Sequence, residues 1–447
     1  MRAAKKPTVL IVAFYFPPAG GGGVQRPLKF AGQLLAEGFD VHVLAPDDPK
    51  WIDRDDRLSV PAGVTVHRAR YLGPAGRRPA EELYGLPRGR RLLKRAGLTW
   101  RRLLVPDENV TWALTAIPAA LRIVRRADVD VVITTSPPGS IHFVGAAAQA
   151  LTRAAWFADL RDPLVAHPHR RVESPLVRLK EVGLRAVAYL VARRADAIIA
   201  VSQAIAQDVR ARKPRGELVT IPSGADFDDF ATLGYRRGSR FRVIHTGTFF
   251  GKRNPRPFLE ALEQVADVEA RFVGDSRAAD RDWAETLECR NRVTWIPFTA
   301  RDRTLRLQKQ SEVLLLLIPD ADGRGDGVLS GKVFEYLASG RPILAAVPPN
   351  GAAAGLIRET GAGVVVAPDD VDGIARELAA LRDRWRAGDD LGVALTAEQR
   401  ARLDRATRTG ALASLLRRHV RVEPGTPAPA RGVTAFPARD SREIERV

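Results

Sequence analysis

The segment Phe241–Pro255, FRVIHTGTFFGKRNP, decides the fold class of this chain. Its first part, Arg242–His245, belongs to an apolar, β-branched run that predicts a buried strand. A glycine follows this strand directly, and a helical pattern of apolar residues resumes near Glu260–Val265. A buried strand, a glycine-bearing loop and a helix, in this order, form the repeating unit of an α/β protein.

The same unit recurs through most of the chain. In the first half the apolar runs are Val9–Phe14, Val41–Leu44, Val64–His67, Val129–Thr134, Ala155–Ala158, Ala197–Val201 and Leu218–Ile221. In the second half they are Arg242–His245, Ala270–Val273, Val293–Ile296, Val313–Ile318, Pro342–Ala346 and Gly363–Val366. Because these runs are continuously apolar, we expect parallel sheets that are covered on both faces. Helices are predicted between them, for example over Val24–Leu35 and Gly331–Ala338.

One polar, aperiodic stretch interrupts this pattern at about residues 226–240. The pattern begins afresh after it, which predicts two doubly wound parallel-sheet domains, 1–225 and 241–420, that face a shared cleft. The helix-like segment Ala397–His419 is expected either to close the second domain or to cross back to the first. Residues 421–447 carry four prolines, many charges and few apolar residues, so we expect a disordered tail.

Composition excludes several functional classes. Of the 447 residues, 45% are hydrophobic, and Cys289 is the sole cysteine, which excludes disulfide frameworks and cysteine-based metal sites. The seven histidines have no metal-ligand spacing, so we expect no metal. No run of about 18 apolar residues is present to span a membrane. The apolar run Val9–Phe16 is too short for a signal peptide, and we expect a cytoplasmic protein.

The net charge of +18 permits two interpretations. A nucleic-acid-binding protein would interleave basic and aromatic residues, but aromatics are only 6% of the chain, so no nucleic-acid partner is expected. The segment Arg88–Arg102 holds seven basic residues and no acid, with leucines and Trp100 at roughly helical spacing. This pattern suits an anionic membrane surface, which would make the protein peripheral at the inner face of a membrane. The alternative is a solvated helix packed on the domain through its leucines.

Ligands of open parallel sheets bind beyond the carboxyl ends of the strands, so the loops there are candidate sites. In the first half these loops are PPAGGGGVQR, SPPGSIH and DLRDP. The glycines favour close approach of an anion to a helix N-terminus, and the charged trio of DLRDP lies where a cleft is expected. The candidates are Gly22 and Gly23 for donor binding, and His142, Asp159, Arg161 and Asp162 for catalysis. A flexible turn, a helix-terminal histidine and a structural ion-pair turn are the alternatives.

Two loops of the second half carry cations suited to a diphosphate. The first is GTFFGKRNP, and the second is DGVLSGKVFEYLASGRP, in which a lysine occupies the first turn of a helix. A cation there is unfavourable for the helix dipole unless a phosphate caps the same turn. The candidates are Gly247, Thr248, Lys252, Arg253, Ser330, Gly331, Lys332 and Glu335. The alternatives are a surface basic pair and an i,i+3 salt bridge between Lys332 and Glu335.

Taken in order, these stretches resemble the family 4 (group 1) glycosyltransferases, which have the GT-B fold of two Rossmann-like domains. The resemblance covers about residues 8–420, and its motifs are FYFPPAGGGGVQR, TSPPGSIH, FADLRDP, AIIAVSQAIAQDV, VTIPSGADFDDF, HTGTFFGKRNP and GKVFEYLASGRPILA. It implies transfer of a sugar from a nucleotide-sugar donor to a hydroxyl acceptor, with retention of anomeric configuration. It also implies that protein cations replace a metal, so no cofactor is expected beside the donor.

The resemblance assigns roles residue by residue. Lys252 and Arg253 match the cations that grip the diphosphate, and Glu335 matches the second glutamate of a Glu-x7-Glu element, which contacts the ribose. The first glutamate would fall at Gly327, beside Asp326, so the sequence departs from the family there. The loop DLRDP resembles the region near the reacting sugar and the acceptor. A lipid-linked or cell-surface glycan is the expected acceptor, as in polysaccharide biosynthesis, and a nucleotide-sugar epimerase or hydrolase on the same fold is the alternative.

Overall fold

The first domain is built on a seven-stranded, all-parallel sheet with the strand order β3-β2-β1-β4-β5-β6-β7. The computed structural model describes residues 5–47, 53–72, 86–91, 103–165, 167, 174–249 and 251–420. The strands are β1 (Thr8–Ala13), β2 (Asp40–Pro46), β3 (Thr65–Ala69), β4 (Val131–Ser136), β5 (Ala155–Leu160), β6 (Ala197–Ala200) and β7 (Glu217–Thr220). The helices are α1 (Gly22–Ala36), η1 (Val110–Trp112), α4 (Ala113–Arg126), η2 (Gly139–Ile141), α5 (His142–Leu151), α6 (Pro175–Arg194) and α7 (Gln203–Ala211).

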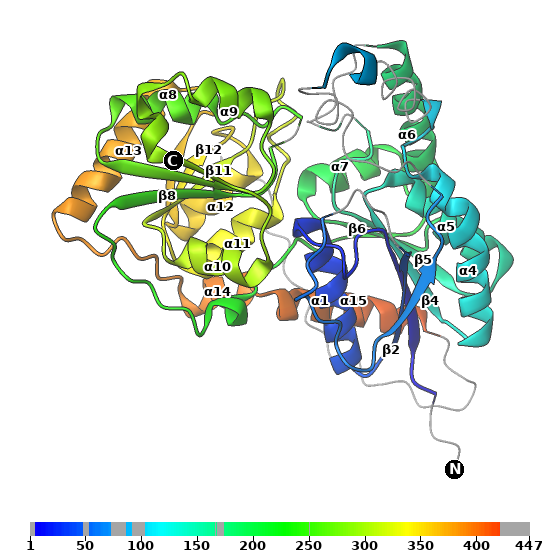
Figure 1. Cartoon of the computed structure of the whole chain (residues 1–447). Helices are drawn as coiled ribbons and strands as arrows, with labels where there is room; N and C mark the ends of the chain where they lie inside the picture. The colour runs from blue at the N-terminus through cyan, green and yellow to red at the C-terminus, as the bar shows by residue number, and fades with distance from the viewer. Residues whose placement is uncertain are drawn as a thin grey trace.

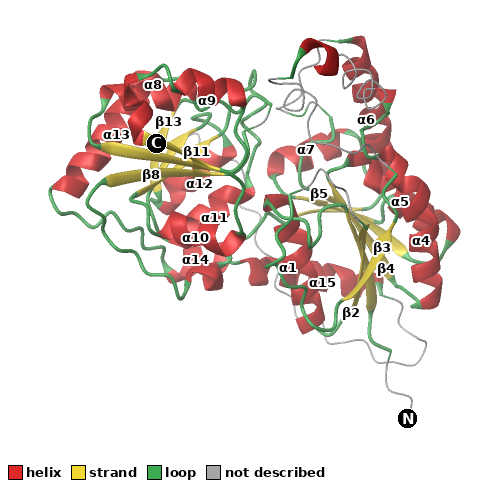
Figure 2. Ribbon diagram, in the orientation of Figure 1, coloured by secondary structure: helices red, strands yellow, loops and turns green. Residues whose placement is uncertain are grey.

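The side chains of β1 show why its sequence is continuously apolar. Val9 and Ile11 pack with α1 on one face of the sheet, whereas Leu10 and Val12 pack with α4 on the other. Successive side chains of a strand point to opposite faces, so a strand with helices on both sides needs apolar residues at every position. Figure 2 shows the helices on both sides of this sheet.

The second domain repeats this plan with a six-stranded parallel sheet in the order β10-β9-β8-β11-β12-β13. Its strands are β8 (Phe241–Thr246), β9 (Val268–Val273), β10 (Val293–Ile296), β11 (Val313–Leu317), β12 (Ile343–Ala346) and β13 (Gly363–Val366). Its helices are α8 (Arg256–Gln264), α9 (Ala278–Ala284), η4 (Glu288–Arg292), α10 (Arg301–Lys309), α11 (Gly331–Ser339), α12 (Ala352–Thr360) and α13 (Val371–Arg386). The predicted α/β class with two doubly wound sheets is confirmed.

The end of the chain returns to the first domain. The predicted helix over 397–419 is two helices, α14 (Ala397–Leu403) and α15 (Arg405–His419), because Asp404 has extended backbone and its carboxylate caps α15. Leu412 and Leu416 of α15 pack in the same core as Val9 and Ile11. Figure 1 shows α15 beside α1. The first domain therefore contains residues from both ends of the described chain. The segment that leads from its last strand, β7, to the first strand of the second domain, β8, contains the short helix η3 (Phe227–Phe230).

Each sheet has one point where the strand order reverses, between β1 and β4 and between β8 and β11. Ligands of doubly wound folds bind at such a point, beyond the carboxyl ends of the strands. The loops that follow these four strands are PPAGGGGVQR, SPPGSIH, GTFFGKRNP and the segment before α11.

Two regions singled out in the sequence fall partly or wholly outside the described residues. In the predicted basic helix Arg88–Arg102, residues 88–91 are helical, and residues 92–102 lie outside the described part. The predicted disordered tail, 421–447, lies outside it as well. Within the described ranges, no helix combines the length and the apolarity needed to cross a membrane.

Candidate functional site

The N-terminus of α1 presents backbone N–H groups at the carboxyl edge of the first sheet. The helix begins at Gly22 after Gly21, whose φ of +86° favours glycine. No side chain of the described residues caps this end, and its first turn contains no acid. A Cβ on Gly22 would meet nothing within 4 Å, whereas one on Gly23 would lie 3.3 Å from Tyr15. The helix therefore starts next to open space, and its uncapped backbone N–H groups could bind an anion there.

Asp159 lies in the core below this helix. Its carboxylate is fully buried and accepts hydrogen bonds from Nε of Arg26 at 3.1 and 3.0 Å, and from Nη2 of Arg26 at 2.7 Å. Thr135 donates a further hydrogen bond of 2.7 Å to the same carboxylate. Arg26 is 3% exposed and also donates to the carbonyl of Ile221. The predicted catalytic Asp159 is thus one half of a buried ion pair that fixes α1 against the sheet.

Arg161 joins the three loops at the carboxyl edge. Its Nε donates to the carbonyl of Ser136 at 2.6 Å, and its guanidinium also contacts the carbonyl of Gly23. Burial lowers the pKa of Arg161, and the carboxylates of Asp159 and Asp162 oppose that shift. Asp162 is half-buried beside it. This arginine therefore fixes the position of the glycine loop relative to β4 and β5.

His142 begins α5 and is fully buried. Its Nδ1 lies 2.9 Å from Oγ1 of Thr134, which also accepts a hydrogen bond from the indole of Trp156. Its Nε2 is buried and has no hydrogen-bond partner in the described residues. Burial lowers the pKa of His142 to about 3, so the ring is neutral near pH 7.

We expect His142 to make the first domain sensitive to acid. The ring has a pKa of about 3 when folded and 6.5 as the ordinary value, so only the unfolded chain takes up its proton between these values. The contribution of His142 to the free energy of unfolding is therefore fully present above about pH 6.5. It decreases as the pH falls, and about 2 kcal/mol is lost at pH 5. Urea unfolding of wild type and His142→Asn at pH 7 and pH 5 measures this. An equal loss of stability in both proteins would contradict the assignment.

In the second domain, Gly247 and Lys332 meet at the end of β8. A Cβ on Gly247 would lie 2.2 Å from Cε and 2.3 Å from Nζ of Lys332, and its φ of +123° also favours glycine. Burial, together with the nearby charge of Arg253, holds the pKa of Lys332 well below its ordinary value, and Glu335 opposes that shift. The structure thus places the lysine of α11 against the glycine loop of β8, two segments that are 85 residues apart in the sequence.

The two cations that follow β8 lie in different surroundings. Arg253 is 6% exposed and donates from Nε to the carbonyl of Leu317 at 3.2 Å and from Nη1 to the carbonyl of Thr248 at 2.9 Å. Lys252 instead forms a 2.9 Å ion pair with the exposed Asp322. Arg253 therefore joins the ends of β8 and β11, and Lys252 extends toward the loop that precedes α11.

The N-terminus of α11 lies beside this group. Ser330 is its N-cap and accepts a hydrogen bond from the backbone N–H of Lys332 at 3.3 Å. Gly331 is exposed, and a Cβ there would meet nothing within 4 Å. The helix N-terminus, Lys332 and Arg253 together form a positively charged region at the switch point of the second sheet.

Glu335 has partners that the sequence did not reveal. Its carboxylate accepts hydrogen bonds from Arg301 and from Nε2 of Gln308, the latter at 2.6 Å. Arg301 also forms a 2.8 Å ion pair with Asp229, and these two carboxylates raise the pKa of the arginine against the effect of burial. Arg301 begins α10, separated from the end of β10 by four residues, and its sequence there gives no indication of these partners.

The carboxyl-end loops of the two domains touch each other. A Cβ on Gly20 would lie 2.6 Å from Phe298, and one on Gly327 would lie 2.4 Å from Ala204 of α7. The carboxylate of Asp55 accepts a hydrogen bond of 2.9 Å from the backbone N–H of Arg301. The resemblance would place a glutamate at Gly327, and here the absence of a side chain permits the contact with α7.

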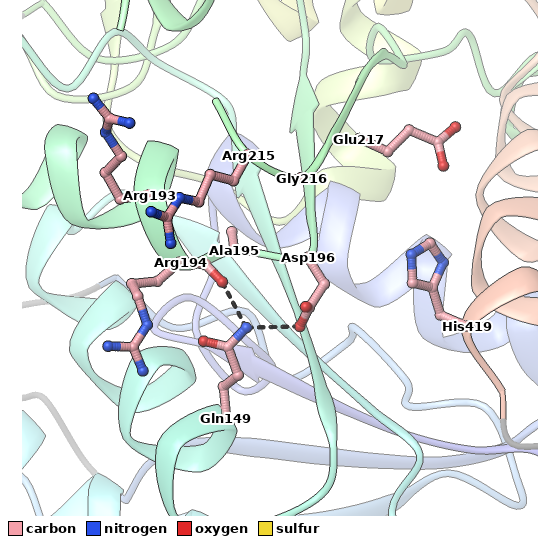
Figure 3. Close-up of a pocket in the computed structure, with 9 residues that line it drawn as sticks. All are labelled: Gln149, Arg193, Arg194, Ala195, Asp196, Arg215, Gly216, Glu217 and His419. Carbon is pink, nitrogen blue, oxygen red and sulfur yellow. Dashed lines mark hydrogen bonds between the residues drawn. The ribbon is translucent and has the colours of Figure 1, made fainter. Parts of the chain in front are cut away.

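A separate depression lies at the opposite, amino edge of the first sheet. It has a volume of about 540 Å³ and is bordered by the ends of α5 and α6 and the starts of β6 and β7. Figure 3 shows Gln149 donating to Asp196 and to the carbonyl of Arg194 there. This depression contains none of the predicted site residues.

Comparison with known proteins gives two family matches. The model for Glycosyltransferase Family 4 matches residues 98–229, and the model for Glycosyl transferases group 1 matches residues 240–384. Together the two matches span more than half of the chain. No curated protein matches at a significant level.

Solved structures of similar fold cover nearly the whole chain. Sucrose-phosphate synthase from Thermosynechococcus elongatus is 16% identical, with a TM-score of 0.67 over 92% of this chain and 99% of that one. Anabaena Alr3699/HepE in complex with UDP-glucose is 17% identical, with a TM-score of 0.59 over 92% and 99%. The lipopolysaccharide outer core galactosyltransferase WaaB is 11% identical, with a TM-score of 0.53 over 92% and 99%.

Proposed function

The chain belongs to the family 4 (group 1) glycosyltransferases, which transfer a sugar from a nucleotide-sugar donor, and we propose that it is a retaining enzyme acting on a lipid-linked or cell-surface glycan. One observation carries the proposal for the site, namely the contact between Lys332 and the positive-φ Gly247 at the switch point of the second sheet. A buried cation with a lowered pKa gains most from an anion that restores its charge.

The donor diphosphate is proposed to bind between β8 and α11. Lys332 and Arg253 supply positive charge, and the N-terminus of α11 supplies N–H groups around Ser330 and Gly331. The carbonyl of Thr248 accepts a hydrogen bond from Arg253 and so positions its guanidinium. Lys252 reaches the diphosphate by exchanging its exposed partner Asp322 for phosphate oxygens. These groups stabilise the charge that develops on the leaving diphosphate, which makes a metal unnecessary in this proposal.

Glu335 is proposed to accept both hydroxyls of the donor ribose. Arg301 and Gln308 hold its carboxylate in place, so the acid is already oriented before the donor binds. An ionised carboxylate has about four lone-pair sites, so Glu335 can accept hydrogen bonds from Arg301, from Gln308 and also from the ribose hydroxyls.

The first domain is proposed to hold the acceptor. The N-terminus of α1 at Gly22 and Gly23 faces the donor side, and Arg161 with Asp162 lies nearest the reacting centre. Asp159 and His142 act through packing, by holding α1 and α5. In the transfer step the acceptor oxygen bonds to the anomeric carbon as the bond to the phosphate oxygen breaks, and the acceptor proton passes to that leaving oxygen. Contact between the domains excludes water, which would otherwise hydrolyse the donor.

The proposal is tested by a thermal-shift screen with UDP-, GDP-, TDP- and ADP-linked sugars. A donor present at about 100 times its Kd stabilises the protein by about 2.7 kcal/mol, so one positive result identifies the nucleotide. The donor that binds is then incubated with a membrane glycolipid fraction, and the product linkage is analysed by NMR. Free sugar or an altered sugar nucleotide formed without an acceptor would contradict transfer and support a hydrolase or epimerase.

We expect Glu335→Gln to weaken donor binding by about 10- to 100-fold, since a hydrogen bond to a charged group contributes about 1.5–3 kcal/mol. The amide keeps the shape of the side chain but loses the charge that pairs with Arg301. Titration calorimetry with the donor found in the screen measures the change. The control is Glu377→Gln on α13, where the acid pairs with Arg376 at 3.8 Å. This variant should bind the donor like wild type. Equal affinity in both variants would remove Glu335 from the site.

A further inference from the structure

Strongly exposed large apolar side chains are confined to the first domain in the part of the chain that the structure describes. They are Leu72, Leu103, Leu114, Leu151, Leu176, Leu179, Val182 and Tyr189. Half of them lie on one helix, α6, and two others lie on α4 and α5, which precede it in the same layer. Figure 1 shows α4, α5 and α6 on the side of the first domain that faces away from the second domain. The second domain has none among its described residues, so this distribution is specific to one domain.

The four residues on α6 form a continuous stripe. At 100° per residue, Leu176, Leu179, Val182 and Tyr189 fall within about 140° of the helix circumference. Their exposed fractions are 38%, 51%, 57% and 56%. The opposite face of the helix is the buried one, with Leu184, Val187 and Val191 in the core. The helix is thus apolar on its outer side as well as on its inner side, which a helix facing only water does not require.

The charges on α6 have one sign on the outer face. Arg178 and Arg185 border the stripe, and neither has an ion-pair partner among the described residues. Arg193 stacks on Tyr189 with its guanidinium 5.1 Å from the ring centre. The single acid of the helix, Glu181, is 5% exposed and points inward. Lys180 has its own partner, Glu108, whose carboxylate lies 3.9 Å from the ammonium. An exposed surface of apolar and cationic groups complements an anionic, apolar partner.

The position of α6 relates this surface to the reaction. The helix ends just before β6, so it runs back along the sheet and, with 20 residues, is about 30 Å long. Leu184, in its middle, already lies against the SPPG loop at the end of β4, where a Cβ on Gly139 would be 2.7 Å from it. Residues 175–182 therefore extend past the carboxyl edge of the sheet. Three of the four stripe residues, Leu176, Leu179 and Val182, therefore lie toward the edge of the sheet that carries the Arg161 and Asp162 loop.

We propose that the outer face of α6, defined by Leu176, Leu179, Val182, Tyr189, Arg178 and Arg185, docks on an anionic lipid bilayer. The apolar stripe enters the interface between headgroups and acyl chains, and the arginines pair with lipid phosphates. This arrangement sets the acceptor-side loops beside the headgroups, which deepens the proposed function by giving a lipid-linked acceptor a route to the site. The docking itself does not depend on which sugar is transferred.

The test is flotation of the full chain with vesicles of phosphatidylcholine alone or with about 30% phosphatidylglycerol. We expect partitioning onto the anionic vesicles to be at least about tenfold stronger, and to fall in about 0.5 M salt. Arg178→Gln/Arg185→Gln should weaken it by about 25-fold, at about fivefold for each basic residue removed from an anionic surface. Leu179→Gln/Val182→Gln should weaken it by about tenfold through the lost apolar contact.

The matched control is Arg376→Gln/Arg384→Gln on the exposed face of α13, which removes the same charge from the second domain. It should bind vesicles within about twofold of wild type, because it leaves the proposed surface unchanged. Equal binding by the α6 variants and wild type would overturn the proposal. So would a dimer in ultracentrifugation that the α6 variants dissociate, since a second copy would then cover the stripe. The α6 variants should keep the donor-induced thermal shift without vesicles, which separates failure of docking from failure of the proposed transferase.

Discussion

Asp159→Ala is expected to lower the free energy of unfolding of the first domain by about 3–5 kcal/mol. The substitution removes the only carboxylate that pairs with Arg26 in the described structure, and both side chains are almost completely buried. A buried guanidinium without its partner retains the full cost of leaving water. Nη1 of Arg26 already lacks a hydrogen-bond partner among the described residues, and without Asp159 the arginine keeps only the neutral carbonyl of Ile221 as an acceptor.

Urea unfolding with a probe in the first domain measures this effect, and two variants sharpen it. Asp162→Ala removes a half-buried neighbour three residues away and should change stability by less than about 1 kcal/mol. Arg26→Met/Asp159→Leu removes both charges, and it should be more stable than Asp159→Ala, since a buried pair replaced by apolar groups leaves no orphan charge. A stable Asp159→Ala protein without transferase activity would show instead that this aspartate contacts the substrate.

Lys332→Ala is expected to reduce kcat by about 10²–10³-fold while the protein stays folded. In the proposed site this ammonium faces the leaving diphosphate from the first turn of α11, and its side chain lies against Gly247. One lost electrostatic contact to a developing charge costs about 3–4 kcal/mol of transition-state stabilisation. The decrease should exceed that of Lys252→Ala, because Lys252 must first leave its ion pair with Asp322.

Single-turnover kinetics with the donor from the thermal-shift screen measures this effect. Lys309→Ala is the matched control, since that lysine donates to the carbonyl of Ser339 at the other end of α11. It removes the same type of charge from the same region and should leave kcat within about threefold of wild type. If Lys309→Ala and Lys332→Ala lost equal activity, general charge in the second domain would explain the loss, and the site assignment would fail.

Part of the candidate site could be predicted from local sequence patterns, and part of it could not. GTFFGKRNP and SGKVFE are recognisable because glycine after a buried strand and a cation in a first helical turn each have a local physical reason. Arg301 and Gln308 had no such signal, since their role comes from reaching Glu335 across 34 and 27 residues. Asp159 shows the converse case. A carboxylate in a strand-end loop suggests chemistry, yet its partner Arg26 lies 133 residues away, and that distance in sequence concealed the pair.

The sequence by itself determined the two parallel sheets and the loops at their carboxyl ends, because continuous apolar runs and glycine turns are properties of neighbouring residues. Only the tertiary structure decided which charges are paired, which side chains are buried, and that α15 completes the first core. It also revealed that α6 is apolar on its outer face, since exposure depends on what every other element covers. Ion pairing and burial arise from contacts between distant segments, and these contacts exist only after the chain has folded.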